Sequence, residues 1–221
     1  MKPFVWDFHG VLEKDNERSV IDISNYVLKK LGFRQRLSKK DNLKLYGKKW
    51  YEYFEYLLPN QTHQKHLEIQ RACIAYEEAN PNIVRSNIKP NDYAIEVLEN
   101  IQKSGHDQIL ISNMSDVALE MFMHSIGISK YFGQKAFACN TRSGNKVYTK
   151  HERLREYLSK KNFEDLVIIG DTPNDISLCD VAGGTTYLYT HPHLKFQDCN
   201  PTYRINDLRK VLKEVDSQVS P

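Results

Sequence analysis

The chain has 221 residues, a formal net charge of +3 and charged side chains spread along its whole length. This length suits one sizeable core with a smaller satellite, because domains usually contain roughly 100–200 residues. Without a basic tail or a block of like charges, the composition gives no reason to expect nucleic acid or a membrane surface as a partner.

Targeting signals and cysteine usage restrict the expected location. No apolar run approaches the roughly 20 residues that a membrane-spanning helix needs. The N-terminus also lacks the charged region, apolar segment and small-residue cleavage site of a signal peptide. The four cysteines are far apart and form no Cys-x-x-Cys pair, which favours reduced thiols over a disulfide framework or a cysteine zinc site. We expect a cytoplasmic, soluble protein.

The first predicted element is a short buried strand that begins at Phe4 and ends on the carboxylate of Asp7, before the chain breaks at Gly10. Open α/β sheets place their ligands at the carboxyl ends of their strands, where Asp7 would lie. The alternative is that Asp7 only caps a turn.

Residues 14–84 show helical periodicity and no strand signal. Helices are predicted at 19–31, from Ser38 to Tyr46, within 47–59 and at 64–78. We therefore expect an all-helical insertion between the first strand and the rest of a sheet. His63 and His66 lie three residues apart on one helical face, but with no carboxylate neighbour evident we interpret them as surface residues rather than metal ligands.

From Pro90 onward the pattern changes, and helices alternate with short apolar strands. Helices are predicted from a cap at 91 or 92 to about 104, at 118–126, from 150, from 176 and at 206–215; strands are predicted at 108–111, 135–138, 166–169 and 185–189, with a turn at 143–145. Continuous apolar strands that alternate with helices are typical of a parallel sheet covered on both faces.

Three polar residues directly follow predicted strands: Asp7, Ser112 and Asp171. If those strands are neighbours in one parallel sheet, the three side chains converge at its carboxyl edge. Asp171 and Asp175 place two carboxylates on one strand-to-helix turn, a set of hard oxygen ligands that suits Mg²⁺ better than Zn²⁺. Helix capping is the alternative role for this pair.

With these motifs in place, nearly the whole chain resembles the haloacid dehalogenase superfamily of phosphatases and phosphotransferases. The segment from Asp7 to Leu12 approximates its first motif, and Ser112-Asn113 after an apolar strand matches the second. Lys150 best fits the third-motif lysine, with Lys146 as the rival, and residues 169–175 closely resemble the fourth motif.

The resemblance implies a fold and a division into domains. It implies an α/β three-layer sandwich with a parallel, Rossmann-like sheet, formed by residues 1–13 and 85–221. Residues 14–84 would be the inserted helical cap that phosphoglycolate-phosphatase-like members carry just after the first motif.

It also implies a reaction, the Mg²⁺-dependent hydrolysis of a small phosphomonoester through an aspartyl-phosphate on Asp7. The cofactor would be Mg²⁺, and its implied ligands are Asp7, Asp171, Asp175 and the backbone carbonyl of His9. The implied phosphate-binding residues are Gly10, Ser112, Asn113 and Lys150, of which Lys150 also counts as catalytic.

His9 departs from the family pattern, because family phosphatases have a second aspartate there that protonates the leaving group and later activates water. Histidine is the commonest general acid–base and can take over this task, but its longer side chain can also miss the position. We predict that His9 acts in acid–base chemistry. A structural role, or a weakened activity, is the alternative.

Other classes of function stay open at this stage. One is a non-catalytic phospholigand-binding protein, and another is a dehalogenase-like or phosphonatase-like hydrolase of C–X or C–P bonds. The Asp171 and Asp175 pair argues against a metal-free dehalogenase. The predicted partner is a small phosphorylated metabolite, bound by a monomer or homodimer, and Gly47, Lys48 and Lys49 are the cap residues expected to contact it.

Overall fold

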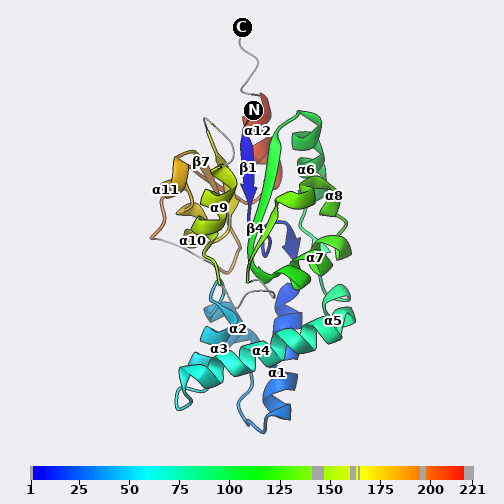
Figure 1. Cartoon of the computed structure of the whole chain (residues 1–221), viewed down its shortest axis with the longest axis vertical. Helices are drawn as coiled ribbons and strands as arrows, with labels where there is room; N and C mark the ends of the chain where they lie inside the picture. The colour runs from blue at the N-terminus through cyan, green and yellow to red at the C-terminus, as the bar shows by residue number, and fades with distance from the viewer. Residues whose placement is uncertain (1, 141–146, 160–162, 164, 195–197, 217–221) are drawn as a thin grey trace. The chain divides into compact units, whose positions relative to one another are not determined.

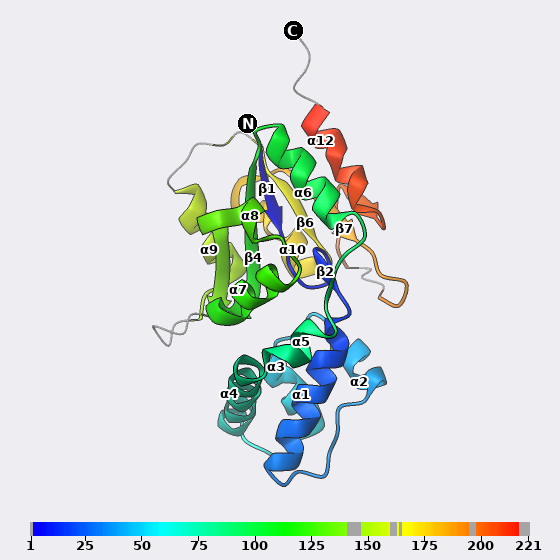
Figure 2. The ribbon, with the colours of Figure 1, turned by 90° about the vertical axis from the view of Figure 1, so that its right-hand side faces the viewer.

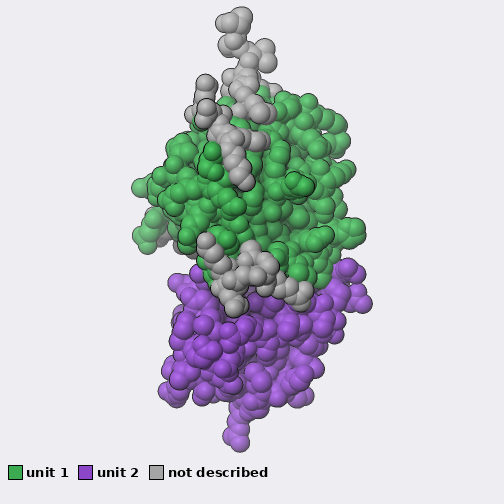
Figure 3. Space-filling view, in the orientation of Figure 1, with its two compact units in different colours: residues 1–14, 89–221 green, residues 15–88 purple. Residues whose placement is uncertain are grey.

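The computed structural model describes residues 2–140, 147–159, 163, 165–194 and 198–216. It divides into two compact units, coloured separately in Figure 3. The core unit comprises residues 1–14 and 89–221, and the helical unit comprises residues 15–88. The sequence predicted the boundaries between the two units after residues 13 and 84. In the structure the second boundary lies after residue 88, because α5 (Pro81–Arg85) packs on the other helices of the helical unit.

A six-stranded sheet with the order β5-β4-β1-β6-β7-β8 forms the centre of the core unit, and each neighbouring pair of strands is parallel (Figure 1). Its strands are β1 (Pro3–Trp6), β4 (Asp107–Ser115), β5 (Ala136–Asn140), β6 (Val167–Gly170), β7 (Thr185–Tyr189) and β8 (Tyr203–Ile205). This is the predicted Rossmann-like α/β arrangement.

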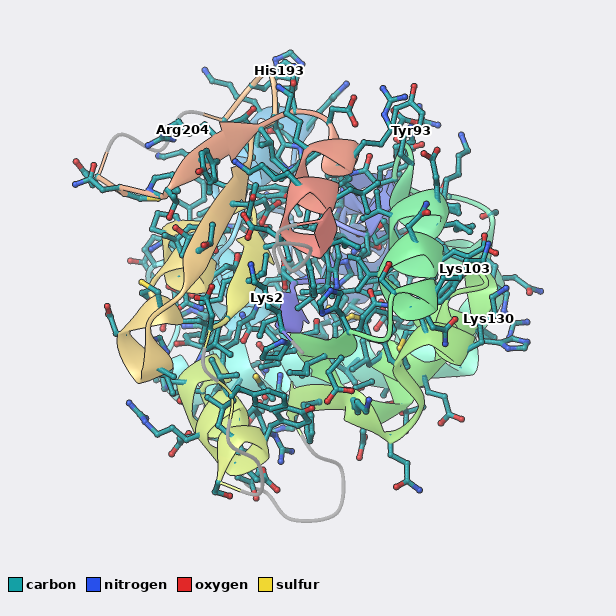
Figure 4. All side chains as sticks on the ribbon, turned by 90° about the horizontal axis from the view of Figure 1, so that it is seen from above. Lys2, Tyr93, Lys103, Lys130, His193 and Arg204 are labelled. Atoms are coloured by element: carbon teal, nitrogen blue, oxygen red, sulfur yellow. The ribbon has the colours of Figure 1, made fainter. Side chains whose placement is uncertain are left out.

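Helices cover both faces of this sheet, as Figure 2 shows with α9 on one side and α6 and α12 on the other. The helical segments of the core unit are α6 (Ala94–Lys103), α7 (Asp116–Ser125), α8 (Ser129–Phe132), η1 (Gly133–Lys135), α9 (Lys150–Leu158), α10 (Pro173–Ile176), α11 (Cys179–Ala182), η2 (Leu208–Leu212) and α12 (Lys213–Asp216). Figure 4, seen from above, places Arg204 of β8 on the opposite side of the core unit from Lys103 of α6 and Lys130 of α8.

Alternation along the strands decides which side chains enter each layer, because successive residues of a strand point to opposite faces. Val5, Ile109 and Ile168 share one face and pack in a single buried cluster with Leu154 and Tyr157 of α9. On the opposite face, the side-chain amide of Gln108 donates a hydrogen bond to the carbonyl of Leu98 in α6, 2.8 Å away. The sheet is therefore buried on both sides.

One predicted strand is longer in the structure, and three short strands were not predicted. The strand that was expected to end at residue 111 continues as β4 to Ser115, with an irregular register between Ser112 and Ser115. A further edge strand, β8, follows the one expected to be last. A two-residue antiparallel ribbon, β2 (Glu13–Lys14) with β3 (Lys89–Pro90), lies where the sequence has no strand signal. The turn predicted at 143–145 lies outside the described residues.

The helical unit contains α1 (Asn16–Lys30), α2 (Lys39–Lys44), α3 (Trp50–Leu57), α4 (His63–Ala79) and α5. Ser38, where the sequence predicted the start of this helix, caps α2, because its hydroxyl accepts a hydrogen bond from the backbone N–H of Asp41. Trp50 packs beside a buried cluster, and its indole N–H donates to the hydroxyl of Ser24 at 2.9 Å. Within the described residues, no helix combines the length and apolar character needed to cross a membrane.

Candidate active site

The carboxyl edge of the central strands brings Asp7 and Asp171 together. Trp6 pairs with Ile169 across β1 and β6, and the backbone N–H of Asp7 donates to the carbonyl of Ile169 at 2.9 Å. The carboxylates of Asp7, Asp171 and Asp175 each place an oxygen within 4.8 Å of the others. The predicted convergence of Asp7 and Asp171 is therefore present in the structure, with Asp175 beside them.

The turn after Asp7 is wound around the carbonyl oxygen of Phe8. The backbone N–H of Leu12 donates to this oxygen at 3.0 Å, and the side-chain amide of Asn91 donates to the carbonyl of Val11 at 2.9 Å. Gly10 has a φ of 76°, a conformation that costs little only for glycine. The glycine thus lets the chain turn sharply away from Asp7 at the edge of the sheet.

Asp175 caps α10, the alternative role that its motif suggested, and also pairs with Lys150. One of its oxygens accepts hydrogen bonds from the Thr172 backbone N–H (3.1 Å) and hydroxyl (2.6 Å), which caps α10. Its other oxygen accepts from the ammonium group of Lys150 at 2.6 Å. Gly170 makes this arrangement possible, since a Cβ at that position would lie 2.0 Å from the Cβ of Asp175.

Replacing Gly170 with alanine is therefore expected to displace Asp175. Overpacking of this kind costs about 1–3 kcal/mol of stability, and we expect weakened Mg²⁺ binding together with that loss. Urea unfolding and Mg²⁺ titration calorimetry measure the two effects. The matched control is Gly105→Ala, which has a positive φ but open space around the new methyl group. Equal Mg²⁺ affinity in both variants would contradict the expectation.

Lys150 links the carboxylates. It is the first residue of α9, only 4% exposed, and its ammonium group donates to both Asp7 and Asp175. A cation is disfavoured at a helix N-terminus, so the two carboxylates must hold it there. Burial favours the neutral amine, but attraction to Asp175 and Asp7 outweighs it and holds the pKa of Lys150 above its usual value. The rival Lys146 lies outside the described residues.

The pKa of Asp7 is raised, whereas an ion pair usually lowers the pKa of a carboxylate. Burial raises it, Lys150 lowers it, and repulsion from Asp175 and Asp171 raises it further, to about 7. The ammonium group of Lys150 pairs with Asp7 and Asp175, and repulsion among the three carboxylates remains. An additional cation held by oxygen ligands would relieve it, and the donor set fits Mg²⁺.

His9 has a buried carboxylate partner that sequence reasoning missed. Its Nδ1 lies 2.6 Å from Oε1 of Glu13, a residue that is 1% exposed, while the His9 side chain remains 36% exposed. The His9 ring also packs edge-on against Phe8 and Phe122, with centroids 5.3 and 5.4 Å away. Glu13 and the two aromatic rings thus fix the imidazole, while part of its side chain remains exposed.

The second predicted motif lies on β4, next to β1. Ser112 is 1% exposed, and its hydroxyl accepts a hydrogen bond from the backbone N–H of Met114 at 3.4 Å. The carbonyl of Asn113 accepts from the side-chain amide of Asn140 at 2.6 Å. Because Trp6 pairs with Leu110, these two residues lie at the same carboxyl edge as Asp7, inside a strand rather than after it.

His191 is a second neighbour of the carboxylates, and no pattern in the sequence indicates it. Its Nε2 lies 2.8 Å from Oδ2 of Asp171. Both residues line one pocket with Arg204 of β8. A residue just beyond the end of β7 can reach Asp171 because β7 pairs directly with β6.

The predicted cap residues lie at the start of α3 in the helical unit. Gly47 has a φ of 80°, and the Lys48 ammonium, on a side chain that is 59% exposed, lies 3.8 Å from a carboxylate oxygen of Glu52. The backbone N–H of Lys49 donates to the same carboxylate at 2.6 Å. Both lysine side chains are exposed, as a solvated pair would be.

The interpretation of His63 and His66 as surface residues without a carboxylate partner was wrong. Only His63 is exposed; His66 is buried, with 4% of its surface exposed. A carboxylate oxygen of Glu55 lies 2.7 Å from Nδ1 of His63.

The structure thus combines a parallel α/β sheet with a lysine-bridged acidic cluster at its carboxyl edge, where open α/β sheets bind their ligands. Residues 4–188 match the family described as haloacid dehalogenase-like hydrolase. The chain belongs to this family, whose members generally use Mg²⁺. Among proteins with curated descriptions, none matches the chain.

Solved structures share the fold at low sequence identity. A predicted phosphoglycolate phosphatase from Haemophilus somnus has a TM-score of 0.77 and 15% identity, with 98% of each chain covered. A haloacid dehalogenase-like hydrolase from Streptococcus pneumoniae has a TM-score of 0.72 and 18% identity, covering 97% of this chain and 98% of that one. CbbY from Rhodobacter sphaeroides, in complex with phosphate, has a TM-score of 0.73 and 13% identity, with 96% of each covered.

Proposed function

We propose that this protein is a Mg²⁺-dependent phosphatase that hydrolyses a small phosphomonoester through an aspartyl-phosphate intermediate. The observation that carries the proposal is the buried carboxylate of Asp7, paired with Lys150 and clustered with Asp171 and Asp175. Its membership of a hydrolase family and its fold likeness to CbbY, which was solved with phosphate, support the proposal.

In the proposed reaction, a carboxylate oxygen of Asp7 attacks phosphorus, and the bond from phosphorus to the alcohol oxygen breaks with its electron pair. His9 gives a proton to the departing oxygen. A water molecule then loses a proton to His9 and attacks the phosphorus of the aspartyl-phosphate, which releases phosphate and regenerates Asp7. The pair of steps returns His9 to its starting protonation state.

The remaining residues would hold the charges of the phosphoryl group. Asp7, Asp171, Asp175 and the backbone carbonyl of His9 would hold Mg²⁺, which when bound neutralises phosphoryl oxygens and orients them. The groups proposed to bind the phosphate are Ser112, Asn113, the backbone N–H of Gly10 and Lys150, a point charge.

The contact with Glu13 supports the proposed acid–base role of His9. The Glu13 carboxylate accepts from Nδ1–H of His9, which leaves Nε2 as the nitrogen that carries the transferred proton. This arrangement resembles the general pattern in which a carboxylate orients a catalytic imidazole. We therefore propose that His9, supported by Glu13, replaces the second aspartate of the family.

We further propose that the helical unit is a substrate-selecting cap, in which Gly47, Lys48 and Lys49 contact the leaving group of a phosphorylated metabolite. A monomer or homodimer in the cytoplasm is the setting that the sequence predicts.

Phosphate release from p-nitrophenyl phosphate and from a panel of phosphomonoesters, with and without Mg²⁺, tests the proposed function. Turnover that requires Mg²⁺ supports it. If no member of the panel is turned over while inorganic phosphate still binds, the protein is a phospholigand-binding protein instead, and the proposal is wrong.

The pKa of Asp7 leads to a pH dependence of Mg²⁺ binding. Because folding raises this pKa from 3.8 to about 7, the metal-free folded chain retains a proton that the unfolded chain has lost. The group therefore stabilises the metal-free fold in acid, and this contribution is lost as the pH rises through about 7. Mg²⁺ must displace the proton, so its affinity is expected to fall by about tenfold per pH unit on the acid side of this pKa.

Calorimetric titration with Mg²⁺ at a series of pH values measures this dependence. The control is Asp7→Asn, in which the dependence should disappear although the remaining affinity is lower. An affinity in the unmodified protein that stays constant from neutral to mildly acid pH would refute the expectation.

A further inference from the structure

A second group of metal-ligating side chains lies in the helical unit, apart from the residues of the proposed reaction. It consists of Glu55, His63 and His66, each of which offers one ligand atom within 4.8 Å of those of the other two. Two imidazoles and one carboxylate are the protein ligands of many zinc sites that leave the fourth position to water.

The helical hairpin formed by α3 and α4 determines how these residues meet. His63 and His66 are three residues apart in the first turns of α4, so they lie on one helical face. Glu55 comes from the last turns of α3. The backbone N–H of Tyr51 donates to the side-chain carbonyl of Gln70 at 2.9 Å, which fixes α3 against α4.

His66 is buried, and one of its ring nitrogens, Nδ1, carries no proton. Its Nε2 lies 3.0 Å from the carbonyl oxygen of Leu58, and because that oxygen can only accept, Nε2 must carry the proton. Nδ1 of the neutral ring therefore has a free lone pair. It has no hydrogen-bond partner among the described residues, although His66 is only 4% exposed.

This arrangement is the one found around metal-bound histidines, whose other ring nitrogen usually donates to a backbone carbonyl or a carboxylate. A simple surface ion pair explains the contact between Glu55 and His63, whose side chains are 41% and 59% exposed. It leaves the buried lone pair of His66 unexplained, and burying such an atom without a partner costs free energy. A metal ion bound to Nδ1 of His66 would give this atom a partner.

We propose that Glu55, His63 and His66 bind one Zn²⁺ ion, with water in the fourth position. The ion links the end of α3 to the start of α4 across residues 58–62 and thereby stabilises the helical unit. Imidazole nitrogens favour Zn²⁺, whereas Mg²⁺ prefers oxygen ligands only. The site is therefore chemically distinct from the carboxylate cluster of the core unit and independent of the proposed phosphatase activity.

Zn²⁺ titration of the full chain in excess Mg²⁺ tests the proposal, since excess Mg²⁺ competes with Zn²⁺ for the carboxylate oxygens of the core unit. We expect one Zn²⁺ per chain, and an affinity loss of more than about 100-fold in Glu55→Gln and in His63→Ala, above the usual cost of losing only an outer-shell partner. Both altered side chains are partly exposed, so these variants should keep their fold. The matched controls are Glu68→Gln on α4 and His124→Ala on α7, which should bind as the unmodified chain does.

Two further measurements locate the ion. Nitrogen-15 NMR should show that Zn²⁺ shifts Nδ1 of His66 while Nε2 keeps its proton. Co²⁺ in place of Zn²⁺ should give the strong visible bands of four-coordinate nitrogen ligation rather than the weak bands of an octahedral oxygen site. The proposal is overturned if no Zn²⁺ binds in excess Mg²⁺, if Glu55→Gln and His63→Ala bind it as tightly as the controls, or if the His66 resonances do not respond.

Discussion

Replacing Asp7 with asparagine is expected to abolish Mg²⁺-dependent phosphate release, with kcat lowered by a factor on the order of 10⁴ or more, as for the loss of other catalytic nucleophiles. The amide keeps the size of the side chain but is too weak a nucleophile to attack phosphorus. The stability should not fall with the activity. Burial disfavours the charged form of Asp7 and, with repulsion from Asp175 and Asp171, raises its pKa to about 7, so we expect the fold to tolerate a neutral side chain there.

Steady-state phosphate release and thermal unfolding of the same samples measure the two effects. Asp180→Asn is the matched control, because it removes an exposed carboxylate from the nearby α11. Borohydride trapping of the acyl phosphate gives an independent readout, with label expected on Asp7 in the unmodified chain only. Activity in Asp7→Asn within tenfold of the control would contradict the proposed nucleophile.

The sequence predicted the central sheet and the meeting of Asp7 with Asp171 because both follow from local patterns. A run of apolar residues predicts a buried strand, and in a parallel sheet all strands end at one edge. The position of a carboxylate after such a run is then sufficient to place it near another one. Asp175 was predicted together with Asp171 because the two share one turn.

Elements without an apolar run were missed. Residues 203–205 form β8, but two of the three are exposed, as befits the edge of a sheet, so they carry no signal of burial. The ribbon of β2 and β3 has two residues in each strand and contains the buried Glu13. No periodicity can be recognised over so short a length.

The sequence also did not predict the contacts between side chains from different elements. The partners Glu13 of His9, His191 of Asp171 and Glu55 of His63 follow from how elements pack, not from spacing in the chain. The four-residue separation of His9 and Glu13 is a helical signal, yet it occurs in a turn that leads into β2. The sequence therefore indicated His9 but not its partner Glu13.

His9→Ala is expected to lower kcat by about 10²–10⁴-fold, the usual contribution of a general acid–base. The KM should change much less, since His9 is proposed to transfer a proton rather than to bind the substrate. His9→Asp should recover part of kcat, because it restores the aspartate of family phosphatases. Glu13→Gln should lower kcat by a smaller factor, about 10–100-fold, as for other partners that orient a histidine.

The Glu13 variant separates orientation of His9 from a general loss of structure. In the unmodified chain, nitrogen-15 NMR should show the proton of neutral His9 on Nδ1, facing Glu13. In Glu13→Gln the amide can instead donate to Nδ1, which moves the proton to Nε2 and blocks the nitrogen that must accept it from water. His124→Ala, an exposed change on α7, controls for the loss of a histidine. Unchanged kcat in His9→Ala would show that the acid–base group lies elsewhere, and an unchanged tautomer in Glu13→Gln would leave Glu13 with a structural role only.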